Sequence, residues 1–417
     1  MPNKDKNIPK RRFKAFENAD AWELRKLGEV MEVTSVKRIH QSDWTDFGVR
    51  FLRARDIVAE SKNESVSEPL FISQKKYDEY TAISGKVTKG DLLVTGVGTI
   101  GIPMLIEKNE PIYFKDGNII WFKNENHIDG QFFYYSFIGK KIQSFIKESA
   151  GIGTVGTFTI NTGKNTPIDL PVLKKEQEAI GTFFSTLDRQ ITLHQRKLDK
   201  LKSVKQAYLS EMFPAEGERV PKRRFPGFTD DWELRKLGEL MNENSERTSD
   251  FANNPLYSLT IENGITPKTE RYERSSLVTK QEDLFKIVKP NEFVTNPMNL
   301  RFGALGYNSN SFRISVSGYY DVFSIDENRC SNYWYAFFKT DRALSILDNV
   351  STGSLIEKRR VKYSTLRQIS FRMPCELDEK IKIGNFFSTL DRHITLHQRK
   401  LEKLKNLKKA LLNELFV

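Results

Sequence analysis

The dominant feature of the sequence is one long unit that occurs twice. Residues 180–202 read IGTFFSTLDRQITLHQRKLDKLK, and 203 residues later positions 383–405 read IGNFFSTLDRHITLHQRKLEKLK, with 20 of 23 positions identical. Between such blocks the two halves of the chain look unrelated. A solenoid would instead repeat many short units with one common core pattern. The repeat therefore predicts two equal frames, each made of the repeated blocks, that carry two different inserts between those blocks.

A second repeated block shows that the order of the unit is cyclic. The sequences IPKRRF (8–13) and WELRKLGE (22–29) recur as VPKRRF (220–225) and WELRKLGE (232–239). The second copy follows the first helix-like block directly, whereas the first copy stands near the N-terminus and the last helix-like block near the C-terminus. If the two ends lie close together, the molecule has a pseudo-twofold axis.

Length and composition exclude several classes of protein. A chain of 417 residues allows two or three domains, and 38% hydrophobic and 12% aromatic residues are too many for a disordered chain. The sequence has neither an apolar run of about 20 residues for a membrane span nor a signal-peptide core. Cys330 and Cys375 lack CxxC spacing, which excludes a disulfide framework and a Cys-based zinc finger and fits the reducing cytoplasm. The net charge of +12 favours an anionic partner such as nucleic acid without requiring one.

Each copy of the repeated block is predicted to be one long helix with a coiled-coil seam. Apolar positions recur at alternating steps of four and three, and no Gly or Pro follows Gly181 or Gly384 within the blocks. From Leu187 to Phe213 such a helix is about 40 Å long at 1.5 Å per residue. Two seams in one chain bury each other most economically, and the cyclic order implies an antiparallel pair; a homodimeric coiled coil is the alternative. The predicted seam consists of Leu187, Ile191, His194, Leu198, Leu201, Leu390, Ile394, His397, Leu401 and Leu404.

The inserts are predicted to be α+β. Short strands are expected over residues 91–95, 118–122 and 312–316, and helices over the aromatic runs 131–137 and 332–338. The whole chain is accordingly divided into a first recognition domain (1–180), a first spacer helix (181–214), a second recognition domain (215–382) and a second spacer helix (383–417).

Motifs for catalysis, cofactor binding and metal binding are not found. Residues 96–101 match G-x-G-x-x-G, but the residues that follow are strand-like, so the helix that would hold a pyrophosphate is missing. The five His residues do not cluster, and His194 and His397 fit a polar contact in the seam better than a metal site. We therefore expect no catalytic residue, no metal site and no cofactor in this chain.

Candidate DNA-binding residues lie on the long helices and in loops. Residues 183–213 carry six basic and three acidic side chains, and residues 386–416 carry seven and three, which together supply +7 of the +12. A solvated coiled-coil face explains those charges equally well. Loops that mix small polar residues with cations offer donors to phosphates and base edges, because Arg reads guanine and Asn reads adenine with two hydrogen bonds each. The candidates are Arg50, Arg53, Arg55, Lys147, Gly153, Thr154, Lys164, Asn299, Arg301, Thr352, Gly353, Ser354, Lys358, Arg359, Arg360 and Lys362.

The pattern as a whole resembles the specificity (S) subunit of type I restriction-modification systems. The resemblance rests on the blocks 170–180 (LPVLKKEQEAI) and 373–383 (MPCELDEKIKI), each of which leads into FFSTLD and a long helix, and on the Trp-x-Leu-x-x-Leu-Gly starts at Trp22 and Trp232. It covers the whole chain. Lys380 in the second block, where the first has Gln177, is a minor departure.

The resemblance implies a non-catalytic subunit with two target-recognition domains that read a bipartite, asymmetric site in double-stranded DNA. It also implies two methyltransferase subunits that use S-adenosylmethionine, and two restriction subunits that use ATP and Mg²⁺, as partners in the cytoplasm away from any membrane. A stand-alone bipartite DNA-binding regulator, an assembly scaffold without base readout and an enzyme with an unrecognised site are the alternatives. The DNA target, the half-site spacing and the methylated bases do not follow from the sequence.

Overall fold

The computed structural model describes residues 7–62, 64–150, 156–261, 264–268, 284–325, 330–355 and 358–417. The chain divides into two compact units. Unit 1 comprises residues 1–194 and 400–417, and unit 2 comprises residues 195–399. The two long helices α7 (Lys174–Glu211) and α12 (Leu377–Leu415) contribute to both units. Among the described residues, no helix is both long and apolar enough to cross a membrane.

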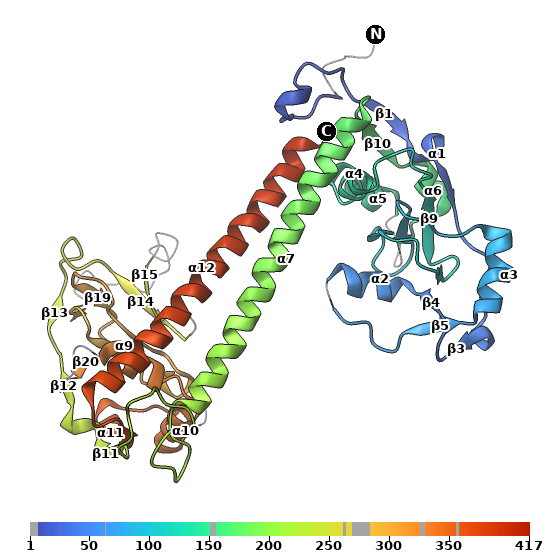
Figure 1. The fold of residues 1–417 in the computed structure, drawn as a ribbon. Helices are drawn as coiled ribbons and strands as arrows, with labels where there is room; N and C mark the ends of the chain where they lie inside the picture. Colours follow the sequence, from blue (N-terminus) through green and yellow to red (C-terminus); the bar gives the residue numbers. More distant parts are fainter. Residues whose placement is uncertain are drawn as a thin grey trace. The chain divides into compact units, whose positions relative to one another are not determined.

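In each unit one end of α7 lies beside the opposite end of α12, and the two run antiparallel (Figure 1). In unit 1 the centroids of the Phe184 and Phe416 rings are 5.8 Å apart, and Asp188 pairs with Lys408 at 2.7 Å. Residue numbers along α12 therefore decrease as those along α7 increase, which is the order of an antiparallel pair. In unit 2 Lys205 pairs with Asp391 at 2.5 Å. The predicted antiparallel pair of long helices is confirmed.

Unit 1 contains three small sheets. Their strand orders are β2-β9-β6-β7, β3-β5-β4-β8 and β1-β10, and every pairing is antiparallel except β4 with β8. The elements are β1 (Glu23–Lys26), α1 (Leu27–Val30), β2 (Glu32–Thr34), β3 (Trp44–Thr45), β4 (Val49–Leu52), α2 (Ala54–Ser61), β5 (Leu70–Ile72), α3 (Gln74–Ser84), β6 (Leu92–Thr95), β7 (Pro103–Leu105), β8 (Ile112–Phe114), β9 (Ile119–Lys123), α4 (Gly130–Phe137), α5 (Lys140–Ser149), α6 (Ile160–Asn165) and β10 (Pro167–Leu170).

Unit 2 has sheets of order β12-β20-β17-β18, β13-β16-β19, β14-β15 and β11-β21. Its elements are β11 (Glu233–Lys236), η4 (Leu237–Glu239), β12 (Met241–Glu243), β13 (Arg247–Thr248), β14 (Tyr257–Thr260), β15 (Gly264–Pro267), β16 (Phe285–Val288), β17 (Phe293–Thr295), η5 (Leu300–Phe302), β18 (Leu305–Tyr307), β19 (Ile314–Val316), β20 (Asp321–Ile325), α9 (Ser331–Phe337), α10 (Asp341–Val350), α11 (Tyr363–Leu366) and β21 (Ser370–Met373).

The two inserts share a topology that their sequences do not reveal. The sheet β2-β9-β6-β7 in unit 1 and the sheet β12-β20-β17-β18 in unit 2 have the same strand order. Each is followed along the chain by an aromatic helix, a second helix, a short helix and a strand that returns to pair with the first strand of its unit. What differs is the additional material, namely the β3-β5-β4-β8 sheet in unit 1 and the sheets β13-β16-β19 and β14-β15 in unit 2.

The secondary structure predicted for the inserts is confirmed. The expected strands form β6, β9 and β19, and the aromatic runs form α4 and α9. The long helices begin at Lys174 and Leu377, earlier than the predicted starts at 181 and 383, and run through Gly181 and Gly384. A Cβ on Gly181 would lie 2.5 Å from Asp129 Oδ1, and one on Gly384 2.6 Å from the Tyr333 backbone nitrogen. These glycines therefore serve the close approach of the aromatic helix and do not interrupt α7 or α12.

The core of each unit contains the end of the long helix of the other repeat. In unit 1 the ring of Phe416 packs 6.3 Å from Trp22 and 5.5 Å from Phe132. In unit 2 the ring of Phe213, 203 positions earlier, packs 6.1 Å from Trp232 and 5.7 Å from Tyr333. The last turn of each long helix thus completes a hydrophobic core that belongs to the other copy of the repeated unit.

The repeated Pro-Lys-Arg-Arg-Phe segment closes each unit in the same way. The Arg11 backbone N–H donates to the Glu414 carbonyl at 2.9 Å, and the Arg223 N–H donates to the Glu211 carbonyl at 2.8 Å. The next arginine in each copy, Arg12 or Arg224, makes a bidentate contact with a buried glutamate near the start of the following long helix, Glu176 or Glu379. Arg11, near the N-terminus, and Glu414, near the C-terminus, therefore lie close together in unit 1, as a pseudo-twofold repeat requires.

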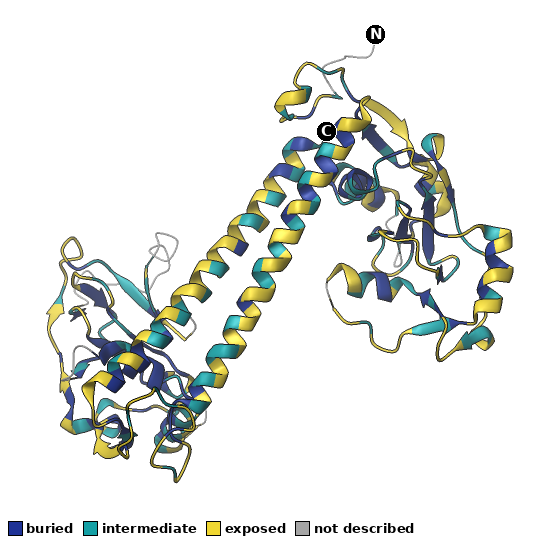
Figure 2. Cartoon of the chain, in the orientation of Figure 1, coloured by how far each residue is buried: buried dark blue, intermediate teal, exposed yellow. Residues whose placement is uncertain are grey.

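The predicted seam residues are all buried or half-buried, while exposed residues occupy the outer faces of α7 and α12 (Figure 2). The two lysines that interrupt the apolar pattern, Lys205 and Lys408, are half-buried. Each pairs with an aspartate of the FFSTLD motif of the other repeat, which explains why a charged residue is retained at this place.

Substitution of Phe213 should destabilise unit 2 selectively. Phe213→Ala removes a ring that is 5% exposed, and we expect a loss of about 3–5 kcal/mol in the free energy of unfolding. Chemical denaturation measures the loss, and hydrogen exchange locates it in β17 and β20 while β6 and β9 stay protected. Leu193→Ala, on the exposed face of α7, is the matched control, with less than about 0.5 kcal/mol expected. Equal loss of protection in both units would contradict the assignment of Phe213 to the core of unit 2 alone.

Candidate nucleic-acid interface

Nine of the predicted DNA-binding residues come together in unit 2. They lie on the turn between β17 and β18 and on the segment 351–362 that follows α10. The Val361 N–H donates to the Pro297 carbonyl at 2.9 Å, which joins the two segments. Thr352 and Arg360 are paired by an isolated two-way β-bridge, with hydrogen bonds of 3.0 and 2.9 Å. The nine residues are Asn299, Arg301, Thr352, Gly353, Ser354, Lys358, Arg359, Arg360 and Lys362.

Two of these arginines, Arg301 and Arg359, hold the loop and are half-buried, whereas the other cations of the group are exposed. Arg301 pairs with Asp348 at 2.8 Å, and its side chain is only 10% exposed. Arg359 donates to the Asp348 and Ser351 carbonyls at 3.1 and 3.2 Å, at the C-terminal end of α10. The hydrogen bond from Arg301, with the charges of both arginines, holds the pKa of Asp348 below its usual range. Both side chains therefore help to hold the loop, and DNA binding by Arg301 and Arg359 stays a prediction.

The remaining residues of this group are open to solvent. Lys358, Arg360 and Lys362 are exposed, as are Thr352 and Asn299. Gly353 has a structural reason to be glycine, because a Cβ there would lie 2.7 Å from the Lys358 carbonyl oxygen. The described residues of segment 351–362 thus present three cations beside small polar groups, an arrangement suited to phosphate contacts.

In unit 1 the predicted residues lie on separate elements. Arg50 is on β4, where its Nη1 is enclosed with no hydrogen-bond partner among the described residues, and its guanidinium is 5.8 Å from the Phe71 ring. Arg53 directly precedes α2, and its guanidinium donates two hydrogen bonds to Asp56 in the first turn of that helix; its side chain is 18% exposed. Arg53 therefore has a structural role.

Three further cations of unit 1 are exposed. They are Arg55 at the start of α2, Lys147 on α5 and Lys164 on α6. Gly153 and Thr154, which were predicted to lie beside them, fall outside the described residues. The described candidates of unit 1 are therefore spread over β4, α2, α5 and α6, whereas those of unit 2 lie on two segments joined by a hydrogen bond.

The glycine-rich segment 96–101 is the unit 1 counterpart of the β17–β18 turn. It joins β6 to β7, so a strand follows it and not a helix, as predicted. Gly96 exchanges backbone hydrogen bonds with Phe158 and Asn118, and Gln143 of α5 donates to the Gly101 carbonyl at 3.0 Å. Lys147, one turn further along α5, lies on the element that supports this segment.

The sequence reasoning missed two apolar residues of the β17–β18 turn. Met298 is 40% exposed and Phe302 is 52% exposed. The sequence does hold a signal for the exposure of Met298 and Phe302. Both lie in the run Asn-Pro-Met-Asn-Leu-Arg-Phe-Gly (296–303), in which turn residues alternate with large apolar residues without the periodicity of a helix or a strand.

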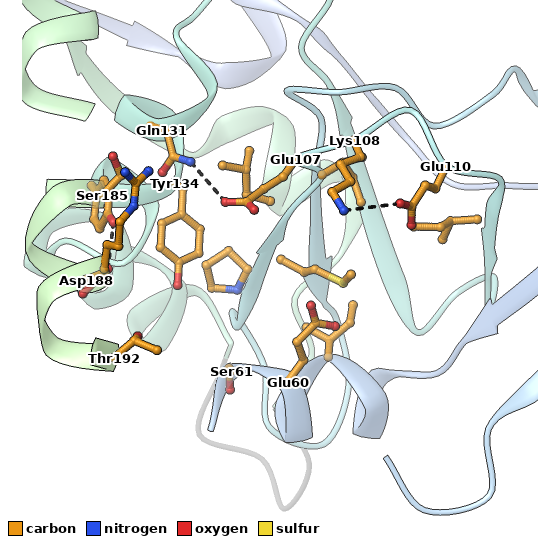
Figure 3. A pocket seen from close by; sticks show the side chains of 18 residues that line it. Glu60, Ser61, Glu107, Lys108, Glu110, Gln131, Tyr134, Ser185, Asp188 and Thr192 are labelled. Carbon is orange, nitrogen blue, oxygen red and sulfur yellow. Dashed lines mark hydrogen bonds and ion pairs between the residues drawn. The ribbon is translucent and has the colours of Figure 1, made fainter. Parts of the chain in front are cut away.

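A pocket of about 620 Å³ in unit 1 has the wrong charge for a phosphate site. Its lining includes Glu60, Glu107, Glu110 and Asp188, with Tyr134 between them (Figure 3). Gln131 donates to Glu107 at 3.2 Å, and Lys108 pairs with Glu110 at 3.6 Å. Burial raises the pKa of Glu60. Among the described residues, no group of three or more His, Cys, Asp or Glu side chains is arranged to hold a metal ion.

Lys339 stabilises the β17–β18 turn through hydrogen bonds. Its ammonium group donates to the carbonyl oxygens of Gly303 and, at 3.1 Å, of Ile261. Burial, with a contribution from the nearby charge of Lys205, lowers the pKa of Lys339 from 10.5 to about 8.

The depressed pKa of Lys339 predicts that unit 2 gains stability between pH 8 and pH 10.5. In this window the unfolded chain binds a proton that the folded chain has lost, so the free energy of unfolding rises with pH, whereas below pH 8 both states are protonated. Urea unfolding of the wild type and Lys339→Met at several pH values measures this: the difference, wild type minus variant, should increase from pH 8 to pH 10. Lys362→Met, at an exposed site, should leave the slope unchanged. Parallel curves for wild type and Lys339→Met would contradict the prediction.

Comparison with known proteins gives one consistent family. A family model described as the type I restriction modification DNA specificity domain matches the chain twice, over residues 19–203 and 229–406. A Haemophilus influenzae protein named as a type I restriction enzyme specificity subunit is 30% identical over 125 residues, which cover 29% of this chain; the match spans about a third (31%) of that relative's length.

One solved structure shows the same fold. The crystal structure of the S subunit of a type I restriction-modification system from M. genitalium aligns with a TM-score of 0.63 at 14% identity, over 98% of this chain and 99% of that one. The HsdS subunit of Thermoanaerobacter tengcongensis aligns with a TM-score of 0.44 at 17% identity, over 96% and 99% of the two chains.

Proposed function

The chain belongs to the type I restriction modification DNA specificity family, and from this premise we propose that it reads a bipartite, asymmetric DNA site, one half with each unit. The observation that carries the proposal is that one specificity domain occurs twice on nearly identical frames with different inserts. Two different readers imply two different half-sites, and hence an asymmetric target. The family itself is non-catalytic.

The frame supports the second part of the proposal, that the chain assembles two copies of each partner. Both copies of the frame repeat the same Asp–Lys and Arg–Glu pairs and the same terminal phenylalanine. Two equal frames offer one partner type two equal docking places. The partners proposed are two methyltransferase subunits and two restriction subunits, which would bind S-adenosylmethionine, ATP and Mg²⁺ themselves.

The solvent-exposed residues indicate how the chain would contact DNA. Phosphate contacts from exposed cations such as Lys358, Arg360 and Lys362 would provide affinity that falls with salt concentration. Discrimination between bases, worth about 1–3 kcal/mol for each good bidentate contact, would come from side chains that reach the groove.

Exchange of one insert should change one half-site only. We expect that replacing residues 240–375 with the matching insert of another family member alters one half of the methylated sequence and leaves the other half unchanged, because these residues lie within unit 2. Sequencing the methylated sites of a host that carries the complex measures both halves at once. A change in both halves would refute the proposal.

Purification separates this proposal from the alternative of a stand-alone regulator. The tagged full chain should co-purify with a methyltransferase subunit and methylate DNA only in that complex. Specific binding of a bipartite site by the chain alone, with no methyltransferase bound, would favour the regulator.

A further inference from the structure

The turn between β17 and β18 in unit 2 is held rigidly. The Asn296 side chain accepts a hydrogen bond from the Met298 N–H at 3.1 Å, and the Ala304 N–H donates to the Asn299 carbonyl at 3.1 Å. Leu300 is 1% exposed and anchors the turn in the core. Gly303 closes the turn in the left-handed conformation, with a φ of +87°. A turn fixed in this way keeps the side chains at its tip in defined positions.

The tip exposes large apolar side chains where a solvated turn would carry polar ones. Phe302 is 52% exposed and Met298 is 40% exposed, with the exposed amide of Asn299 between them. The guanidinium of Arg301 lies 4.1 Å from the centroid of the Phe302 ring and is itself fixed by Asp348. The cation therefore covers one face of the ring and restrains its orientation.

The surroundings of the tip are basic. The hydrogen bond from the Val361 N–H to the Pro297 carbonyl places the tip against the segment that carries Lys358, Arg360 and Lys362. An exposed apolar turn joined to a segment with three exposed cations matches the surface of a duplex, in which apolar base edges lie next to phosphates. It suits an apolar protein surface poorly, because the cations would lose water without gaining a partner.

The corresponding turn of unit 1 is built differently. Residues 96–101 carry glycine at three of six positions, and a Cβ at Gly98 would meet open space. Its exposed positions, Gly98 and Thr99, bring only backbone and a small side chain to a ligand. The two units therefore differ in the chemistry that they present at the same place in a shared topology.

We propose that Phe302 is a specificity-determining residue of unit 2 that makes an apolar contact with a base, with Met298 beside it and Asn299 as a donor and acceptor. Arg301 is a positioning residue that holds the ring through the stack and through Asp348. The inference rests on the proposed function, and it assigns to Phe302 the direct reading that sequence reasoning had given to Arg301.

Half-site discrimination tests the proposal. In the complex with the methyltransferase subunit, Phe302→Ala should lose discrimination at one or two adjacent positions of a single half-site, by about 5- to 150-fold, the range that about 1–3 kcal/mol corresponds to. The other half-site should be unchanged. Phe302→Leu, which keeps an apolar side chain, should retain part of the discrimination. Tyr319→Ala, at a tyrosine of unit 2 that is 49% exposed, is the matched control and should behave like the wild type.

Salt dependence separates an apolar base contact from a phosphate contact. Phe302→Ala should leave the slope of log affinity against log salt concentration unchanged, whereas Lys362→Ala should make it shallower by about 1. For Arg301, the loss in Arg301→Ala should fall at the same base position, and the double variant Arg301→Ala with Phe302→Ala should lose no more than Phe302→Ala alone. A merely structural Arg301 would instead lower discrimination at both half-sites or add to the Phe302 loss.

Two results overturn the inference, and they are distinguishable. If Phe302→Ala methylates the same sequence with the same discrimination as the wild type, Phe302 does not read a base, while the proposed function stands. If the wild-type complex shows no bipartite methylated sequence at all, the proposed function fails and the inference fails with it. Hydrogen exchange of β17 and β18 shows whether Phe302→Ala is folded. If the alanine variant unfolds, Phe302→Leu replaces it: a folded Phe302→Leu with reduced discrimination supports the inference, and one with wild-type discrimination overturns it.

Discussion

The structure depends on an exchange of helix ends between the two repeats. Each long helix starts beside its own insert and finishes in the core of the unit built on the other copy, where Phe213 or Phe416 packs on a tryptophan and on the aromatic helix. Because burial of such rings is a main source of stability, neither recognition domain has a complete core without the helix of the other repeat. The same requirement explains why the frame is nearly identical twice while the inserts are free to differ.

Two arginines and two lysines of the frame are paired within it. Arg12 and Arg224 contact buried glutamates, and Lys205 and Lys408 contact aspartates of the partner helix. Loss of one partner from such a half-buried pair leaves a charge that has lost water and has no counter-charge, which keeps both members in place. Net charge alone is therefore a poor guide to the DNA-binding surface, although more than half of the +12 lies on the long helices.

The same distinction governs the candidate interface. Arg53, Arg301 and Arg359 are typical base-reading residues by type, yet each holds a loop or contacts the first turn of a helix. The exposed cations of residues 358–362 fit phosphate contacts, and the apolar tip with Phe302 offers a direct contact to bases. In unit 2 the predicted base readers Arg301 and Arg359 contact Asp348 or its neighbours, which the sequence could not show, because a guanidinium looks the same in a sequence whether it faces DNA or an aspartate.

The sequence by itself determined the long helices, their antiparallel pairing, the positions of β6, β9, β19, α4 and α9, and the presence of two recognition domains. These follow from local periodicity and from a repeat that can be read directly along the chain. Only the tertiary structure decided that the two inserts share one strand order, that each core contains the end of the other repeat's helix, and which cations are free to contact a ligand. Those features depend on contacts between residues far apart in the chain, such as Arg301 with Asp348 and Trp22 with Phe416, and no local pattern encodes such pairs.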